Sequence, residues 1–282
     1  MPAPSEWHHC VHWPRSSALF VPCCYVQRSV EKKAMRQRLG GYYSGQGATT
    51  YGTLKYALHE ALDDPVWAAA AGAPSALWLE FGVFGGLSIN ITTKYRDKLP
   101  VGGGVPLVHG FDTFTGLPSA WKSGKGTFFK RSAFSWAAKG LGRLPPVRKG
   151  VQLHVGLFNE TLPPFMAQRP SGCVVWSNID CDLYVGARDA LGQIGGRLCP
   201  HARLHFHEVI KHWSWVAKRF EAGTAHTLIP SDETRALWEW LRTEAGAKAA
   251  LELSPVKSKS NSDAAFFVVR RSGTSPDSGK PA

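Results

Sequence analysis

Seven short apolar runs, most of which end in glycine or a polar residue, constrain the fold of this chain more than any other feature. Their length and composition are typical of buried strands. Helix-length connections separate most of them, and this alternation predicts βαβ units around a mostly parallel sheet with helices on both faces. The first five runs cover residues 76–81, 106–111, 151–155, 174–179 and 203–206, and the last two cover residues 250–253 and 264–269.

Several of the connections show helical periodicity. In residues 51–63, Leu54, Leu58 and Leu62 fall on one helix face. The last two apolar runs have no helix between them, which predicts an antiparallel pair at one edge of the sheet. Further helices are expected near residues 88–98, 186–197 and 234–244, with a short one near residues 30–39.

Polar residues or glycines mark the ends of the predicted strands. Ligands of open α/β sheets bind beyond the carboxyl ends of the strands, so these positions are the first candidates for a functional site. The residues are Glu80 and Gly82 at the first strand, Asp112 at the second, Gly156 to Asn159 at the third, Asp180 and Asp182 at the fourth, and His207 and Glu208 at the fifth.

The turn after the first strand is rich in glycine. Gly82, Gly85 and Gly86 let the backbone approach a ligand closely and precede a helix start with free N–H groups. The pattern differs from the dinucleotide fingerprint and from the phosphate loop, and a glycine-rich helix start that only packs on the sheet would look the same. Asp112 lies 26 residues after Gly86. It can accept hydrogen bonds from ribose hydroxyls, or it can cap its own turn.

Acidic residues and a histidine end two strands that we expect to be neighbours. Asp180 and Asp182 favour a hard divalent cation, or they can act as a general base. His207 and Glu208 end the next strand, which a right-handed crossover places beside the fourth. The alternatives are that the acidic pair caps the following helix and that His207 is a satisfied, half-buried histidine.

Four segments, in this order and spacing, resemble the signature of the macrocin-type O-methyltransferases. They are EFGVFGGLS (80–88), GFDTFTGLP (110–118), GLFNETLP (156–163) and NIDCDLY (178–184). The resemblance covers roughly residues 50–270. It implies a class I S-adenosylmethionine-dependent enzyme that methylates sugar hydroxyls on natural products. It also implies a Rossmann-like fold with a mostly parallel seven-stranded sheet and an antiparallel closing strand.

The resemblance implies roles for individual residues. Asp180 would bind a divalent cation, usually magnesium, that positions the acceptor hydroxyl. The family's second acidic pair is replaced by His207 and Glu208, which favours manganese or another borderline metal, or leaves His207 as the base. Asn178 stands where the family commonly has histidine. The cofactor would contact Glu80, Gly82, Val83, Gly86 and Ser88 on its methionine and ribose side, Asp112 with Thr113 at the ribose hydroxyls, and Phe158 with Asn159 at the adenine.

These observations predict an S-adenosylmethionine-dependent O-methyltransferase that acts, with a divalent cation, on a hydroxyl of a sugar or natural product. Asp180 and His207 are the predicted catalytic residues, and Asp180, His207 and Glu208 are the predicted metal ligands. Residues 51–270 form the methyltransferase domain, between a partly disordered extension (1–50) and a disordered tail (271–282). The alternatives are a nucleic-acid methyltransferase or binder, and a non-catalytic protein of the same fold.

The net charge of +12 is unevenly distributed. Residues 1–50 and 101–150 carry +4 and +7 of it, and the eight basic residues from Lys122 to Lys149 have no acidic residue among them. This segment is either a solvated lid whose aromatic residues pack on the core or an element that covers an anionic acceptor. Basic and aromatic residues also suit a nucleic acid, but the sequence has no recognisable nucleic-acid-binding module.

The six cysteines form no CxxC pair and no even ladder. Neither a zinc finger nor the disulfide framework of a secreted protein is therefore expected. Reduced thiols and a cytoplasmic location are the prediction, with organelle targeting by residues 1–50 left open. No apolar run reaches the ~18 residues of a membrane-spanning helix, and no secretory signal is expected. The predicted partner is a small molecule, and a homo-oligomer is compatible with the sequence.

Overall fold

A computed structural model describes residues 50–99, 104–122, 127–140, 142–207, 209, 232–253 and 265–269 of the chain. Several predictions fall outside these residues. They are the short helix near residues 30–39, the role of Glu208, the extension before residue 50 and the tail after residue 270.

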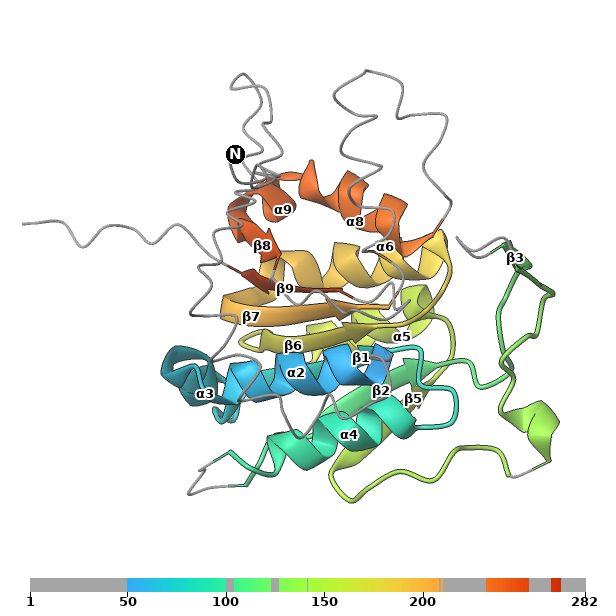
Figure 1. Cartoon of the computed structure of the whole chain (residues 1–282), viewed down its shortest axis with the longest axis horizontal. Helices are drawn as coiled ribbons and strands as arrows, with labels where there is room; N and C mark the ends of the chain where they lie inside the picture. Colours follow the sequence, from blue (N-terminus) through green and yellow to red (C-terminus); the bar gives the residue numbers. More distant parts are fainter. Residues whose placement is uncertain are drawn as a thin grey trace, which may run out of the picture.

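A seven-stranded sheet forms the centre of the molecule. Its strands are β1 (Ala76–Phe81), β2 (Val108–Asp112), β5 (Val151–Val155), β6 (Cys173–Ile179), β7 (Leu198–Phe206), β8 (Leu251–Leu253) and β9 (Ala265–Val269). They lie in the order β5-β2-β1-β6-β7-β9-β8 (Figure 1). The first five run parallel, whereas β9 is antiparallel to both of its neighbours. The predicted α/β fold and its antiparallel edge are confirmed.

The helices of the described residues are α2 (Thr50–Leu62), α3 (Pro65–Ala71), α4 (Leu87–Arg96), α5 (Phe158–Ala167), α6 (Tyr184–Ile194), α8 (Glu233–Leu241) and α9 (Glu244–Ala249). α2, α3 and α4 cover one face of the sheet, and α5 and α6 cover the other, with α8 packed against α6 (Figure 1). Because both faces are covered, β1 and β6 are buried along almost their whole length. None of these helices is long and apolar enough to cross a membrane.

Three helices were not predicted from the sequence: α3, α5 and the short α9, which follows directly after the predicted helix near residues 234–244. α3 begins with Pro65 after Asp64, whose side chain accepts hydrogen bonds from the N–H groups of Val66 and Trp67. Asp at the N-cap and Pro at the first helical position are ordinary signals of a helix start. The helix was not predicted because the segment is rich in alanine. α5 contains Pro163 and Pro164, and proline normally disfavours a helix interior. The helix persists because its apolar face is buried, with Leu162, Phe165 and Met166 packed in the core.

The basic segment between the second and third parallel strands contains a small hairpin of β3 (Trp121–Lys122) and β4 (Phe128–Phe129). Trp121 stacks on Phe129, with ring centroids 5.1 Å apart, and packs into a small cluster with Leu117 and Leu183. Trp136 packs against the main core. These contacts favour the interpretation in which aromatic residues of the segment pack on the fold for Phe129 and Trp136, whereas Phe128 and Phe134 are exposed.

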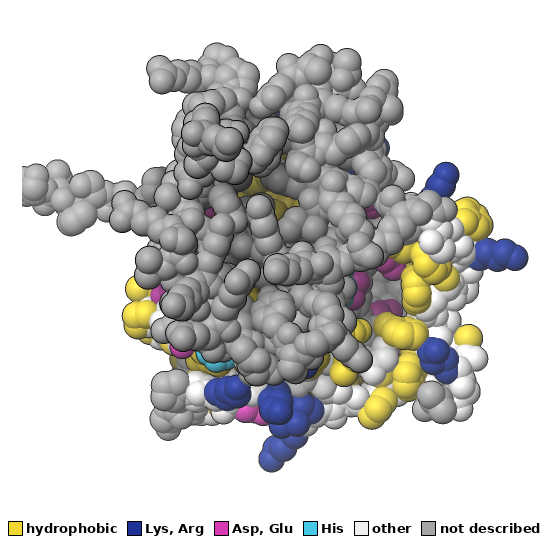
Figure 2. All heavy atoms as spheres, in the orientation of Figure 1, with side chains coloured by type: hydrophobic (Ala, Val, Ile, Leu, Met, Phe, Trp, Pro, Cys, Tyr) yellow, Lys and Arg dark blue, Asp and Glu magenta, His cyan; other side chains and the backbone are white. Residues whose placement is uncertain are grey.

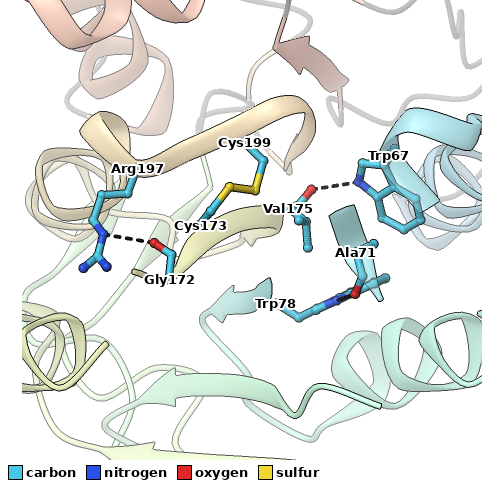
Figure 3. Close-up of a disulfide and its surroundings, with 8 residues drawn as sticks. All are labelled: Trp67, Ala71, Trp78, Gly172, Cys173, Val175, Arg197 and Cys199. Carbon is cyan, nitrogen blue, oxygen red and sulfur yellow. Dashed lines mark hydrogen bonds between the residues drawn. A yellow bond between two sulfur atoms is a disulfide. The ribbon is translucent and has the colours of Figure 1, made fainter. Parts of the chain in front are cut away.

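Two cysteines differ from the expectation of reduced thiols. Cys173 at the start of β6 and Cys199 at the start of β7 form a disulfide, with their Cα atoms 5.3 Å apart (Figure 3). The register of the two strands pairs Val174 with Leu198, which brings the cysteines side by side. Cys173 and Cys199 are 26 residues apart in the sequence, so their spacing could not predict that they lie next to each other. Among the described residues Cys181 is a free thiol.

Candidate functional site

A cavity of about 590 Å³ opens at the carboxyl ends of the parallel strands. Its volume lies in the usual range of small-molecule sites, roughly 300–1,000 Å³. Gly82, Asp112, Gly156 and Asp180, which end or follow four neighbouring strands, line it. Its rim carries four exposed apolar side chains, Phe84, Phe134, Leu157 and Val185. On the right of the view in Figure 2, acidic side chains lie among hydrophobic ones, while Lys and Arg side chains project from the margin.

The predicted site residues form two layers around this cavity. Five of the nine predicted cofactor residues line it: Gly82, Asp112, Thr113, Phe158 and Asn159. The other four are buried behind its wall: Glu80, Val83, Gly86 and Ser88. Asp180 also lines the cavity, whereas His207 contacts Asp180 from behind. Glu208 lies outside the described residues.

Asp112 holds the glycine-rich turn in place. Its Oδ2 accepts hydrogen bonds from the backbone N–H groups of Val83 and Phe84, both at 2.8 Å. Its Oδ1 accepts one from the N–H of Phe114 at 2.7 Å, the turn cap that the sequence suggested as an alternative role. A carboxylate has about four acceptor positions, so Asp112 keeps capacity for a ligand hydroxyl in the cavity.

Gly82 permits a close approach of two backbone segments. It has a φ of +88°, and a Cβ atom at this position would lie 1.8 Å from the carbonyl oxygen of Asp180. Gly86, with a φ of +80°, is the N-cap of α4 and lies against Pro146 and Val147. The glycine at position 82 therefore brings the turn after β1 against the turn after β6, and both turns reach the same cavity.

Glu80 is a fully buried carboxyl group behind the first turn. It accepts a hydrogen bond of 2.6 Å from the Ser88 hydroxyl. Burial raises the pKa of Glu80 to about 8 against the opposing hydrogen bond from Ser88, and the nearby Asp180 adds to the rise. At neutral pH this side chain is therefore mostly protonated and uncharged.

Glu80, Asn178 and His205 lie at the same register position on β1, β6 and β7. His205 Nδ1 lies 2.7 Å from Asn178 Oδ1, so the imidazole donates to the amide oxygen. Burial, and then the neighbouring His207, lower the pKa of His205 well below its ordinary value. The row is thus buried, polar and mostly uncharged at neutral pH, and it supports the strand ends that carry the site.

Asp180 and His207 form the contact in the site that best suits acid–base chemistry. The Nδ1 atom of His207 lies 3.0 Å from Oδ2 of Asp180. The Asp180 side chain is 31% exposed and the His207 side chain 10%, so the carboxylate faces the cavity and the imidazole lies behind it. Tyr51, which lines the cavity, packs edge-on against the His207 ring with centroids 6.4 Å apart. The arrangement suits an acid–base pair whose outer member is the carboxylate.

The predicted metal ligands are only partly described. Asp180 and His207 are brought together, but they contact each other. Across the part of the chain that the structure describes, no three His, Cys, Asp or Glu side chains gather into a metal site. The described donors therefore form a two-residue pair.

The charge of the cavity differs from that of the segment beside it. Four carboxylates line the cavity, from Asp112, Asp180, Asp182 and Asp189, and none of its described lining residues is Lys or Arg. None of the described basic side chains between Lys122 and Lys149 lines the cavity, although Lys139 Nζ lies 5.2 Å from the ring centroid of Phe84 on the rim, and this segment contributes Phe134 to the rim. An anionic acceptor drawn in by this segment therefore stays a prediction.

Tyr51 and Glu233 are among the residues at the site that were not predicted from the sequence. Tyr51 lies 31 positions before Gly82 and reaches the cavity from α2. Glu233 lies in the first turn of α8, and its carboxylate accepts hydrogen bonds from the backbone N–H groups of Cys181 and Asp182. Asp232 before it signals a helix start, but no sequence pattern indicates where that helix docks.

This architecture is the Rossmann-like fold of class I methyltransferases. The solved structure of CalS11, a calicheamicin methyltransferase, aligns with 88% of this chain and 95% of its own, at 19% sequence identity and a TM-score of 0.50. At this level of identity the similarity shows the fold alone.

Two other solved structures align at lower scores. The O-methyltransferase NovP covers 78% of this chain and 81% of its own, at 14% identity and a TM-score of 0.46. TomG from Streptomyces achromogenes, an O-methyltransferase of tomaymycin synthesis solved with S-adenosylmethionine, covers 88% and 92% at 15% identity and a TM-score of 0.46. These scores are too low to add to the comparison. Neither protein-family models nor curated protein sequences yield a match.

Proposed function

We propose that this protein is an S-adenosylmethionine-dependent methyltransferase that methylates a hydroxyl of a small molecule, a sugar or a natural product, and that residues 51–270 form the catalytic domain. One observation carries the proposal: Asp112 and Asp180 face a single cavity from the strands on either side of β1. A donor and an acceptor that react together need polar anchors within reach of one another. The fold places the cavity where α/β proteins bind their ligands.

The residues around the cavity suit the cofactor. Asp112 has an acceptor position for a ribose hydroxyl, with Thr113 next to it. Phe158, whose ring centroid lies 5.4 Å from that of Phe81, offers an apolar wall for the adenine beside Asn159. When bound, the cofactor supplies an electrophilic methyl group. The remaining proposed cofactor residues support the first turn from behind: Glu80, Val83, Gly86 and Ser88.

Asp180 and His207 are the proposed catalytic pair. Asp180 takes the proton of the acceptor hydroxyl, since its carboxylate faces the cavity. His207, whose Nδ1 lies 3.0 Å from Oδ2 of Asp180, donates a hydrogen bond that orients the carboxylate, and the proton stays on Asp180. The walls of the cavity hold the hydroxyl oxygen in line with the methyl group, which supplies much of the acceleration of a displacement reaction.

A divalent cation is the alternative partner of Asp180. Asp180, His207 and Glu208 would hold magnesium or manganese, which would lower the pKa of the acceptor hydroxyl when bound. The two described donors, Asp180 and His207, contact each other, and this suits a base better than a ligand set. Activity that persists in excess chelator supports the pair. Activity lost to the chelator and restored by magnesium would assign Asp180 to a cation.

Mass spectrometry of S-adenosylhomocysteine formation tests the proposal. The purified protein is incubated with S-adenosylmethionine and a panel of acceptors that includes neutral glycosides and TDP-rhamnose, the substrate that the name of CalS11 records. We expect product with at least one hydroxylated acceptor and none with its deoxy analogue. A folded protein that neither binds the cofactor nor forms product would contradict the proposal.

A further inference from the structure

We propose that Glu233 is a positioning residue of the site. From the first turn of α8 its buried carboxylate holds the turn formed by Asp180, Cys181 and Asp182 against the cavity. The inference rests on the proposed function for its consequence in catalysis, but the contact itself can be tested without any acceptor.

The contact is a pair of hydrogen bonds to one oxygen. Glu233 Oε1 accepts from the backbone N–H of Cys181 at 2.8 Å and from that of Asp182 at 3.2 Å. The Glu233 side chain is fully buried. Hydrogen bonds from backbone N–H groups to a carboxylate are stronger than neutral ones, and burial increases their effect. The two bonds link α8 to the turn across about 50 residues of sequence.

The turn that Glu233 holds is unusual in its backbone. Asp182 has a φ of +62°, in the left-handed region that L residues rarely adopt. The neighbouring Gly82 is packed against the carbonyl of Asp180, so the turn is confined from the β1 side as well. Such a conformation persists only where its surroundings hold it. All three residues of the turn line the cavity, so a shift of its backbone moves both carboxylates relative to a bound acceptor.

Glu239 provides a matched control on the same helix. Its Oε2 accepts a hydrogen bond of 2.6 Å from the hydroxyl of Tyr184, the first residue of α6. Glu239 thus also links α8 to the chain just after the turn, but none of its hydrogen bonds involves the backbone N–H groups of the turn. A general loosening of α8 would follow from either variant, whereas loss of the turn follows only from the variant at Glu233.

Hydrogen exchange followed by mass spectrometry tests the contact directly. In Glu233→Ala we expect the amides of residues 181 and 182 to exchange at least about tenfold faster than in the wild type. In Glu239→Ala we expect them to exchange at the wild-type rate. Glu233→Gln keeps an oxygen that can accept both bonds and should restore most of the protection. Unchanged exchange in a folded Glu233→Ala protein, or equal acceleration in both alanine variants, would overturn the proposal.

Kinetics with an acceptor found in the panel test the consequence. Displacement of the turn by about 1 Å can cost on the order of 100-fold in rate. We therefore expect kcat of Glu233→Ala to fall at least tenfold, with cofactor affinity unchanged and with Glu233→Gln within a few-fold of the wild type. If Glu233→Ala does not fold, Glu233→Asp, whose shorter side chain cannot reach both N–H groups, replaces it. Faster exchange without loss of kcat would overturn the positioning role, and failure of cofactor binding in the wild type would count against the proposed function alone.

Discussion

Glu80, Asn178 and His205 are three polar side chains that adjacent strands bury with little or no charge at neutral pH. Register places them side by side, and burial shifts the pKa of both titratable members toward the neutral form. Asp112 and Asp180, in contrast, reach the cavity and are among the carboxylates available to a ligand. Position relative to the strand end therefore decides which acidic residue supports the site and which one acts in it.

The stability of the protein is expected to depend on pH through Glu80. The unfolded carboxyl loses its proton near 4.5, whereas the folded one keeps it up to about 8. Between these values the folded state binds the extra proton, so the free energy of unfolding falls as pH rises, by up to about 1.4 kcal/mol per pH unit. Urea unfolding of the wild type and Glu80→Gln at several pH values measures this. The wild type should lose stability more steeply, and parallel profiles would refute the assignment.

A substitution at Asp180 should separate the proposed catalytic step from cofactor binding. Asp180→Ala removes the carboxylate that faces the cavity, so turnover should fall by about 100-fold or more while cofactor affinity changes little. The control is Asp189→Ala, which removes another lining carboxylate that is bonded to Arg188 at 2.8 Å. Steady-state kinetics and calorimetry on both variants check the prediction. Equal turnover in the two variants would remove the catalytic role of Asp180.

Residues at strand ends could be predicted from the sequence, and residues that reach the site from elsewhere could not. Asp112 and Asp180 each follow a recognisable apolar run, and parallel strands bring their carboxyl ends to one edge. Tyr51 and Glu233 come from helices whose docking depends on the whole fold. The sequence also could not predict that His207 lies behind Asp180. The apolar pattern places His207 at a strand end but does not show which way its side chain points.

At the scale of elements, the turns after β1 and β6 depend on each other. Gly82→Ala would place a Cβ atom 1.8 Å from a carbonyl oxygen at a φ of +88°. We expect a loss of about 2–5 kcal/mol in the free energy of unfolding, from the left-handed backbone and the overlap together. Gly192→Ala is the control, because no atom lies within 4 Å of a Cβ atom added there in α6. It should leave stability unchanged or raise it by up to about 1 kcal/mol. Similar melting temperatures for both variants would contradict this account of the turn.

Most elements follow from the sequence because apolar runs and helical periodicity are strong signals. β1 and β5 have the predicted bounds, and β7 extends five residues further toward the amino end than predicted. Pro200 and the left-handed His201 interrupt the apolar pattern of β7, and the register with β6 shifts in the same region. Local irregularity of this kind hides a strand from pattern analysis, although the strand remains paired in the sheet.

For the molecule as a whole, the net charge of +12 and the charge of the cavity have opposite signs. The carboxylates line the cavity, and the described basic side chains of the central segment lie outside it. A neutral acceptor should therefore show a KM that changes less than about twofold between low and high salt, since screening acts on charged partners. Kinetics across a salt series measure this. A KM that rises steeply with salt for an anionic acceptor would restore the basic segment as its binding element.

Calorimetric titration with S-adenosylmethionine tests the central claim that this cavity is a methyl-donor site. We predict that one cofactor binds per chain with a dissociation constant of about 1 μM to 1 mM, and that Asp180→Ala binds it with a similar dissociation constant. Asp112→Asn should bind it at least tenfold more weakly, because the amide of asparagine presents a donor to the N–H groups of Val83 and Phe84. A folded wild-type protein that gives no binding heat with the cofactor or with S-adenosylhomocysteine would contradict the account.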